Sequence, residues 1–509
     1  MLQIVWFKRD LRVHDNEALS RAARHGRVLP LYIVEPEFWQ QPDMSGRHWA
    51  FIRECLLSLN QELVRLGHPL VIRTGEAVQV LEALIEQHPV GGVWSHQETG
   101  NAWTFHRDRA VAGLLRRHGL TWHQPRQHGV VRGHLDRDSW SRQWEALMTA
   151  SRFLPPRLHP IQGLAAGRLP GQHLPDMPND PCPGRQGGGR PAAEQALQSF
   201  LLVRGARYHV EMSSPRTAST ACSRLSAHLA WGTLSIREAL QETRRRRAEI
   251  KRVPPDRRGV WGRALAAFEG RLHWHCHFMQ KLESEPRFEF EDMQPAMSGL
   301  RDARPDRDRL DAWVSGNTGW PLVDACMRAL AHGGWINFRM RAMLMSVASY
   351  QLWLHWREPA LHLATQFVDY EPGIHYPQAQ MQSGTTGINS LRIYNPIKQS
   401  LDHDGNGTFI RTWVPELGGL DNRWIHTPWE TPESAQQRCG VRIGRDYPAP
   451  LVDHVAAARA ARRKILQVRR TSEARDQSRR IYDRHGSRKR PRQDRSGAPR
   501  QHELFGDGE

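Results

Sequence analysis

Short apolar runs alternate with helical repeats of apolar positions along the first 123 residues. Runs rich in β-branched and aromatic residues occupy residues 2–7, 28–34, 70–73, 92–95 and 120–123. Apolar positions recur at helical spacing over residues 17–23, 49–66, 78–87 and 108–117. This alternation predicts a Rossmann-like α/β domain over residues 1–150, with a parallel sheet covered by helices on both faces. Ligands of such sheets bind at the carboxyl ends of the strands.

The pattern changes twice further along the chain. Residues 151–193 lose periodicity and are rich in Pro and Gly, which predicts an interdomain linker. Beyond it, strand-like runs almost vanish, so residues 194–465 are expected to form an all-helical domain. Its helices are expected over residues 194–208, 235–251, 259–282, 309–314, 321–331, 338–356 and 359–367. The end, residues 466–509, is dense in charge and predicts a basic disordered tail.

One stretch of the helical region, residues 313–396, has an unusual polar content. Charged residues such as Asp324, Arg341 and Asp369 stand within apolar helical runs, where each requires a partner. The last third is rich in Gly, Gln, Thr and Asn and has little hydrophobic periodicity, so we expect a polar loop laid over the helices. Such a loop over buried charges would suit a large, polar, aromatic ligand.

Composition narrows the classes of function. The formal net charge of the 509 residues is +18, which favours a polyanionic partner and nucleic acid first, although part of the excess lies in the tail. The six cysteines include no CxxC pair, which indicates reduced thiols in a cytoplasmic protein without a metal site. The sequence has no apolar run of about 18 residues, so no membrane partner is expected. It also lacks a GxGxxG or Walker-type motif, which argues against a dinucleotide fingerprint or an NTPase.

Three motifs, in this order, resemble those of the photolyase/cryptochrome flavoproteins. They are IVWFKRDLRVHDNEAL at 4–19, SRLSAHLAWGTLSIRE at 223–238, and GNTGWPLVDACMRAL with GGWINFRMR and RIYNP within 316–396. The resemblance covers about residues 2–435 and implies an FAD held in a U-shaped conformation by the helical domain. It also implies a second, antenna chromophore of unidentified kind in the α/β domain. The resemblance further implies that the protein is a monomer and that its partner is UV-damaged DNA, single- or double-stranded. The four cysteine ligands of the family's iron–sulfur branch are missing.

The resemblance assigns residues to the FAD phosphates. Tyr208, Ser223 and Ser226 match positions whose hydroxyls or amides contact these anions, at a helix N-terminus where the dipole favours them. Ordinary helix capping is the alternative for the two serines. Cys222 stands where the family commonly has Thr. The complete predicted cofactor set is Tyr208, Cys222, Ser223, Leu225, Ser226, His275, Phe338, Arg341, Asp369, Glu371 and His375.

Other members of that set match positions around the flavin ring. Arg341 and Asp369 match an ion pair lying against the isoalloxazine, where a purely structural pair is the alternative. Glu371 matches a carboxylate near the polar edge of the ring, and Phe338 replaces an Asn. His375 aligns with the position facing the flavin N5, where it would make redox behaviour depend on pH. The alternative is a histidine satisfied elsewhere, since two prolines flank it.

The photoreduction path and the substrate pocket depart from the family pattern. Trp356 matches the middle member of a three-tryptophan chain, but the flavin-proximal member aligns with Ala379, so the usual path is broken. Trp274 matches a tryptophan that stacks on damaged bases, with a core aromatic as the alternative. Arg271 stands where a Glu would bind the dimer, and Met381 where a second stacking Trp would lie. Glu269 would substitute for that Glu only after a shift of helix register.

These assignments give the predicted functional sets. The catalytic residues are Trp274, Arg271, His375 and Trp356, and the DNA-binding residues are Trp274, Met381, Arg392 and Lys398, the last two for phosphate contact. The favoured function is light-driven splitting of pyrimidine dimers by electron transfer from photoexcited reduced FAD, with cyclobutane dimers ahead of (6–4) products. His273, His275 and His277 keep the (6–4) product open as a substrate, because that reaction needs a histidine acid. The alternatives are a cryptochrome-like blue-light receptor and a flavoprotein with vestigial photochemistry.

Overall fold

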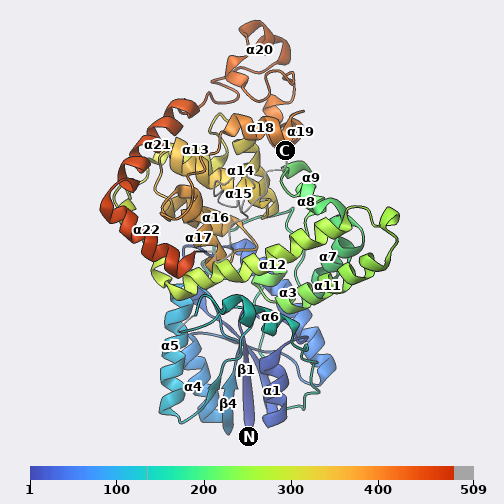
Figure 1. Cartoon of the computed structure of the whole chain (residues 1–509). Coiled ribbons are helices and arrows are strands. Elements are labelled where there is room, and N and C mark those ends of the chain that lie inside the picture. The colour runs from blue at the N-terminus through green and yellow to red at the C-terminus, as the bar shows by residue number, and fades with distance from the viewer. Residues whose placement is uncertain (134–135, 487–509) are drawn as a thin grey trace.

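The computed structural model describes residues 1–133 and 136–486, in which an α/β domain and a helical domain lie one above the other (Figure 1). The strands are β1 (Leu2–Phe7), β2 (Arg27–Val34), β3 (Val71–Thr74), β4 (Val90–Trp94) and β5 (Trp122–His123). They form one parallel sheet in the order β3-β2-β1-β4-β5, which confirms the predicted sheet. Ile4 of the central strand pairs with Leu29 on one side and Val93 on the other.

Helices cover both faces of this sheet, as predicted. They are α1 (Glu17–His25), α2 (Pro36–Trp39), α3 (Gly46–Leu66), α4 (Ala77–Gln87) and α5 (Ala102–Arg117). Leu81 of α4 and Leu114 of α5 pack with Ile4 in one apolar cluster, whereas α1 and α3 pack on the opposite face (Figure 1). Asn16 and Asn101 start α1 and α5, because each side chain accepts a hydrogen bond from a backbone N–H of the first turn.

The junction between the domains differs from the prediction. An unpredicted helix, α6 (Trp140–Thr149), packs its buried tryptophans into an apolar cluster of the helical domain, so the α/β domain ends before residue 150. Residues 151–189 form no helix or strand, in agreement with a linker. The linker is nevertheless pinned along α3, because Arg47 pairs with Asp180 at 2.6 Å and Arg185 pairs with Glu54 at 2.5 Å. The α6 segment therefore falls within the residues expected for the α/β domain but packs with the helical domain.

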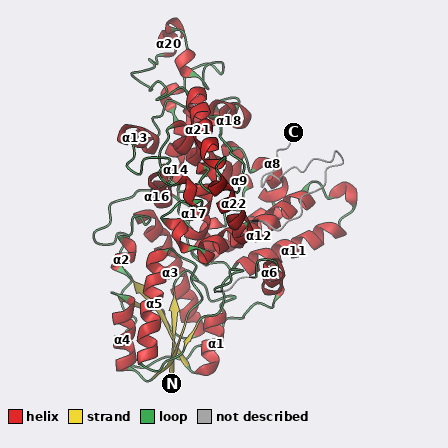
Figure 2. Cartoon of the chain, turned by 60° about the vertical axis from the view of Figure 1, so that its left-hand side comes forward, coloured by secondary structure: helices red, strands yellow, loops and turns green. Residues whose placement is uncertain are grey.

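Beyond the linker, the residues that the structure describes are mostly helical, and the five strands lie near the N-terminus (Figure 2). The helices are α7 (Arg190–Leu202), α8 (Tyr208–Glu211), α9 (Pro215–Ala221), α10 (Ser226–Ala230), α11 (Ile236–Arg252), α12 (Trp261–Ser284), α13 (Arg307–Ser315), α14 (Pro321–Gly333), α15 (Phe338–Ser346), α16 (Arg357–Gln366), α17 (Pro372–Ser383), α18 (Pro396–Asp404), α19 (Thr408–Trp413), α20 (Glu433–Cys439), α21 (His454–Arg469) and α22 (Ser472–His485). A π-helical turn, Val347–Gln351, extends α15, so the helix expected over 338–356 ends early. None of the helices among the described residues is long and apolar enough to cross a bilayer.

The prediction of a polar loop is wrong for its first part, which forms the buried helix α17. Gln380 explains why the sequence pattern failed. Its side chain is fully buried, accepts a hydrogen bond from the Met293 N–H and donates to the Phe288 and Glu291 carbonyls. Such partners come from other elements, so a buried glutamine leaves no hydrophobic period in the sequence. The loop resumes after Ser383 and runs to α18.

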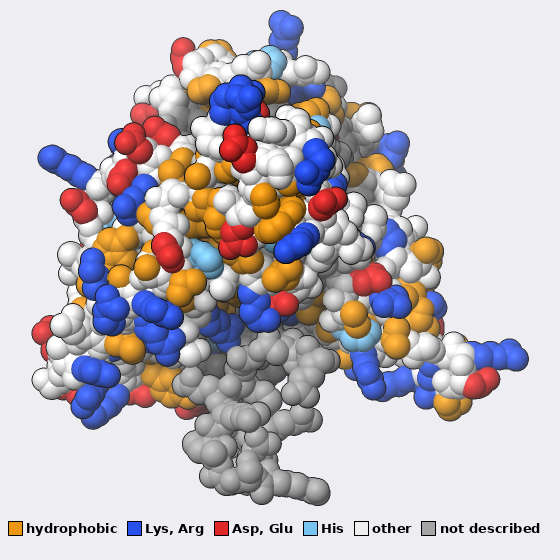
Figure 3. All heavy atoms as spheres, turned by 90° about the horizontal axis from the view of Figure 1, so that it is seen from above, with side chains coloured by type: hydrophobic (Ala, Val, Ile, Leu, Met, Phe, Trp, Pro, Cys, Tyr) orange, Lys and Arg blue, Asp and Glu red, His pale blue; other side chains and the backbone are white. Residues whose placement is uncertain are grey.

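The predicted disordered tail is also wrong over its first part. Residues 472–485 form α22, which packs against the helical domain. His485 bonds Glu285 at 2.7 Å, and the Gln294 amide donates to the Ala474 carbonyl at 2.8 Å. Residues 487–509, the remainder of the predicted tail, lie outside the described residues. Seen from above, Lys and Arg side chains are spread around a more apolar centre instead of forming one patch (Figure 3).

Candidate functional site

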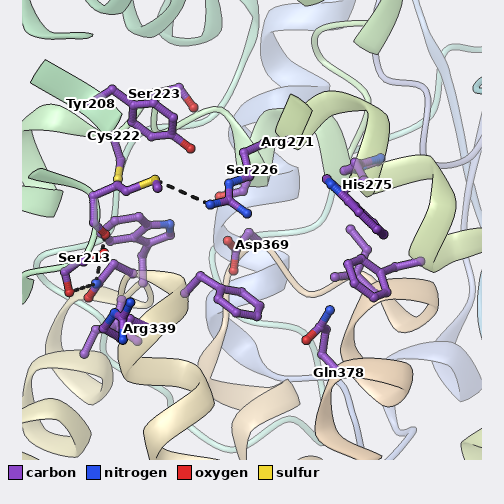
Figure 4. Close-up of a pocket in the computed structure, with 18 of the residues that line it drawn as sticks. Tyr208, Ser213, Cys222, Ser223, Ser226, Arg271, His275, Arg339, Asp369 and Gln378 are labelled. Carbon is purple, nitrogen blue, oxygen red and sulfur yellow. Dashed lines mark hydrogen bonds between the residues drawn. The ribbon is translucent and has the colours of Figure 1, made fainter. Parts of the chain in front are cut away.

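Two adjoining cavities lie inside the helical domain. The larger has a volume of about 580 Å³ and is lined from the α8–α10 region, α12, α15, α17 and the segment leading into α18 (Figure 4). The smaller, of about 160 Å³, lies against α15 and α17. Six residues line both, namely Ser226, His275, Phe338, Asp369, Ile374 and Gln378. The cavities therefore form one continuous site, of the size that proteins use for large organic ligands.

The turn between α9 and α10 provides one wall of the larger cavity. Cys222, Ser223 and Ser226 line it, and Tyr208 lies beside them at the start of α8. Leu225 differs, because its side chain is buried in the core below the turn. Burial raises the pKa of Cys222 to about 12 and that of Tyr208 to about 12, so both groups stay neutral and act as hydrogen-bonding groups at physiological pH.

Arg224 is a lining residue that the sequence reasoning missed, although it lies within the SRLS motif. It adopts a left-handed φ of 61°, which tightens the turn, and its guanidinium lies 4.0 Å over the Trp335 ring. Burial lowers the pKa of Arg224 to about 10, which still leaves it charged. Arg339 is a second missed cation on the same cavity. Together these side chains make this wall attractive to an anion.

The ion pair predicted at residues 341 and 369 is present. Arg341 Nη2 donates to Asp369 Oδ2 at 2.8 Å, and its Nε donates to the Ile336 carbonyl at 2.7 Å. The second carboxylate oxygen, Asp369 Oδ1, is buried without a hydrogen-bond partner in the described structure. Asp369 lines both cavities, so this oxygen is available to a bound molecule.

A second buried carboxylate, Glu371, connects the site to the α/β domain. Arg9, which follows β1, lies 3.4 Å from Glu371 and also donates to the backbone carbonyls of Tyr370 and Ala230. Burial raises the pKa of Glu371 to about 7, and Arg9 opposes that shift. The smaller cavity is thus closed from below by contacts across the domain boundary.

His375 lines only the smaller cavity. Its Nε2 lies 2.7 Å from the Ala360 carbonyl, on the neighbouring helix α16, so this nitrogen is already used in a structural hydrogen bond. Burial lowers the pKa of His375 to about 4, so the ring is neutral at physiological pH. These contacts favour a histidine that is satisfied by the protein over one that serves the flavin N5.

The predicted substrate residues divide into two groups. Trp274, Arg271, Arg392 and Lys398 all line the larger cavity, whereas Met381 and Trp356 line neither cavity. Trp356 is fully buried and donates to Asp292 at 2.8 Å. Glu269 on α12, which could replace the dimer-binding Glu only after a shift of helix register, pairs with Arg244 at 2.8 Å.

Asp324 has the partners that its buried position requires. It accepts a hydrogen bond from the Thr318 hydroxyl at 2.6 Å and another from Tyr447. Of the three histidines near Trp274, only His275 lines the cavities, and burial lowers its pKa to about 4. Its Nδ1 is buried without a partner in the described structure.

A different buried charge cluster lies at the carboxyl ends of the strands in the α/β domain. Lys8 pairs with Asp108 at 2.9 Å, and Arg107 pairs with Glu35 at 2.9 Å and with Glu98. Burial alone would raise the pKa of Glu98, but Arg107 and Lys8 hold it at about 2. Arg107 and Asp108 therefore bond to charged residues of the protein itself.

Comparison with known proteins gives matches over nearly the whole chain. Residues 3–136 match the family model described as DNA photolyase, and residues 268–467 match the FAD binding domain of DNA photolyase. The chain is 31% identical to the deoxyribodipyrimidine photo-lyase of Streptomyces griseus, over 90% of this chain and 97% of that protein. The crystal structure of a bacterial class III photolyase from Agrobacterium tumefaciens superimposes with a TM-score of 0.78 at 27% identity, covering 92% of this chain and 98% of that one. The crystal structure of a cryptochrome from Synechocystis sp. superimposes with a TM-score of 0.80 at 25% identity, covering 91% of this chain and 99% of that one.

The cavity residues fit an FAD. The cations on the wall near Ser223 suit a pyrophosphate, and the buried unpartnered atoms of Asp369, His275 and Gln378 suit a polar ring system. Buried polar groups are nearly always hydrogen-bonded in native proteins, so these atoms indicate a partner that the protein itself does not supply.

Proposed function

Because the chain belongs to the DNA photolyase and cryptochrome family, we propose that it is a light-dependent photolyase that splits pyrimidine dimers, with cyclobutane dimers as its main substrate. One observation carries the proposal. The cavity that fits FAD also presents Trp274, Arg271, Arg392 and Lys398, which suit two flipped-out bases and their phosphates. The alternative of a signalling module needs no such group of residues beside the flavin.

The protein's own residues would bind and orient the two reactants. When bound, reduced and photoexcited FAD would supply the electron that opens the dimer ring, and the electron would return to it afterwards. Arg341 and Asp369 would hold the polar side of the cofactor, and the wall containing Arg224 would hold its phosphates. Trp274 would stack on the bases, while Arg392 and Lys398 would position the backbone. No acid–base step is required of the side chains.

The state of the histidines supports a cyclobutane dimer over a (6–4) product. His275 is the one that lines the cavities, and because burial lowers its pKa to about 4, the ring is not protonated to an imidazolium at neutral pH. His273 packs edge-on against Trp144 with ring centroids 4.8 Å apart, and His277 contacts Arg137. A (6–4) enzyme would need a protonated histidine beside the lesion.

A blue-light receptor is the second candidate. Two departures favour it, since His375 aligns with the position that faces the flavin N5 and Met381 replaces a stacking residue of the substrate pocket. The C-terminal segment does not add to it, because α21 and α22 are docked on the helical domain up to residue 485. Such receptors also depend on photoreduction, and Trp356 lines neither cavity.

The test uses protein purified in the dark, reduced chemically, and mixed with an oligonucleotide that contains one cyclobutane thymine dimer. We expect restoration of intact thymines that requires both light and protein. Trp274→Ala should abolish repair while retaining FAD, and Trp274→Phe should retain part of it because a stacking ring remains. Absence of repair by the wild-type protein with FAD demonstrably bound would exclude dimer repair, and the (6–4) lesion would then be tested.

A further inference from the structure

Two glutamines on α17 carry unpaired polar atoms into the site, and neither has a role in the proposed repair reaction. We propose that Gln378 and Gln382 form an amide pair that recognises the pyrimidine edge of the flavin, one as donor to a ring carbonyl and the other as acceptor from the ring N3–H. This inference rests on FAD being the ligand of the site, as in the proposed function. The family resemblance assigns the polar edge of the ring to Glu371 instead.

The geometry of the pair is specific. The two side chains are 8% and 3% exposed, and they lie one turn apart on the same helix. Gln382 Nε2 donates to Gln378 Oε1 at 3.4 Å, whereas Gln378 Nε2 and Gln382 Oε1 have no partner in the described structure. Both residues line the smaller cavity, and Gln378 lines the larger one too. Figure 4 shows the Gln378 amide directed into the space below His275 and Asp369.

The intervening residue provides an internal contrast. Gln380 has its amide fully bonded to other parts of the protein and lines neither cavity. Glutamines on α17 are therefore fully hydrogen-bonded where they face the protein and partly unbonded where they face the cavity. A buried amide left open costs free energy of about 1–3 kcal/mol, so two of them side by side indicate a ligand.

The chemistry of the open atoms identifies the kind of ligand. One amide bonded to the other leaves a single N–H₂ donor and a single carbonyl acceptor facing the cavity, and turning both amides over exchanges the two without changing that balance. A phosphate would need donors only, and a hydrocarbon would need neither. A cyclic imide, which has an N–H beside a carbonyl, matches the pair, and the flavin ring has this group at its pyrimidine edge.

Two neighbouring candidates for this contact, His375 and Glu371, are already engaged. The His375 Nε2 bonds the Ala360 carbonyl, and Glu371 pairs with Arg9 and accepts from the Gly373 N–H. Neither presents a donor and an acceptor side by side. The glutamine pair is therefore the complementary surface that α17 offers to the imide.

The first test compares binding of FAD and N3-methyl-FAD to the wild-type apoprotein. Methylation removes the N3–H and adds bulk, so we expect a dissociation constant at least tenfold higher, about 1.4 kcal/mol. In Gln382→Met, which keeps the side-chain length without the amide, FAD should bind about tenfold more weakly and the two ligands should become nearly equal. Gln378→Met should instead shift the ring carbonyl stretch of bound FAD, measured by Raman spectroscopy. If the amides are turned over, the two variants exchange these effects.

Several outcomes separate this inference from the proposed function. Equal binding of FAD and N3-methyl-FAD by the wild-type protein, or discrimination unchanged in both variants, would overturn the amide pair. Failure of the folded wild-type protein to bind FAD at all would instead overturn the cofactor assignment and the proposed function with it. Gln87→Met, an exposed substitution of the same type on α4, should change neither readout. Thermal unfolding of each variant establishes that it is folded.

Discussion

The α/β domain and the helical domain each bury a cluster of charged side chains, and the two clusters differ in whether they leave a polar atom open beside the large cavity described above. At the carboxyl ends of the strands, Lys8 and Arg107 pair with Glu35, Glu98 and Asp108 in a closed network. In the helical domain, the Arg341–Asp369 pair leaves one carboxylate oxygen unpartnered beside a cavity of about 580 Å³. The closed network maintains structure, whereas the open pair is prepared for a ligand. Four experiments test this contrast.

Removing the central cation of the closed network should have the largest effect. Arg107→Met leaves the buried Glu35 and Glu98 without their main partner, and an uncompensated buried charge costs about 3–5 kcal/mol in the free energy of unfolding. We expect a strong loss of stability in chemical denaturation of the apoprotein. Arg116→Met, an exposed substitution on α5, serves as the control. Stability equal to that of the control would show that the network is not closed as described.

Breaking the open pair should affect the ligand more than the fold. Asp369→Asn removes the charge that Arg341 contacts and the acceptor that faces the cavity, so we expect FAD to bind about 10–100-fold more weakly. The loss of stability of the apoprotein should be smaller than that of Arg107→Met. Isothermal titration calorimetry gives the dissociation constant of FAD, and chemical denaturation of the same preparation gives the stability of the apoprotein. The exposed pair partner Asp402, changed to Asn, is the matched control.

The pH dependence of stability should report Glu371. Its pKa is about 7 in the folded protein, against 4.5 for an unperturbed Glu, so the folded state favours the protonated form. Its contribution to stability is therefore full below about pH 4.5 and is lost as the pH rises through 7. Glu371→Gln should flatten the decline over this range by about 1–2 kcal/mol in the apoprotein. A decline of the same size in the variant would assign it to other buried acids, such as Glu35 and Glu289.

The smallest effect is expected at the mouth of the cavity. Lys398 is exposed and pairs with Asp402, so Lys398→Ala should weaken DNA binding a fewfold and equally for damaged and undamaged strands. The slope of log affinity against log salt should become shallower by about 0.9, because one phosphate is no longer neutralised. An unchanged salt slope would place the DNA backbone elsewhere. Lys464→Ala on α21, another exposed lysine, is the control.

The architecture and part of the walls of the site could be predicted from the sequence. Alternating apolar runs predicted the parallel sheet, because strand and helix periods are local properties of the chain. The motifs at 223–238 and 316–396 located Ser223, Ser226, Arg341 and Asp369, and all four line the cavities. These residues were found because they stand at fixed spacing within recognisable segments.

Which polar atoms are open depends instead on the tertiary structure. The helix α17 was missed since its buried glutamines leave no hydrophobic period, and the partner of Gln380 is Met293, which lies 87 residues away in the chain. The orientation of His375 depends on a carbonyl of α16, and the docking of α22 depends on contacts with Glu285 and Gln294. Whether a buried polar group is satisfied or open is a property of the whole packed molecule. Its partners come from distant parts of the chain, so no local pattern of residues encodes it.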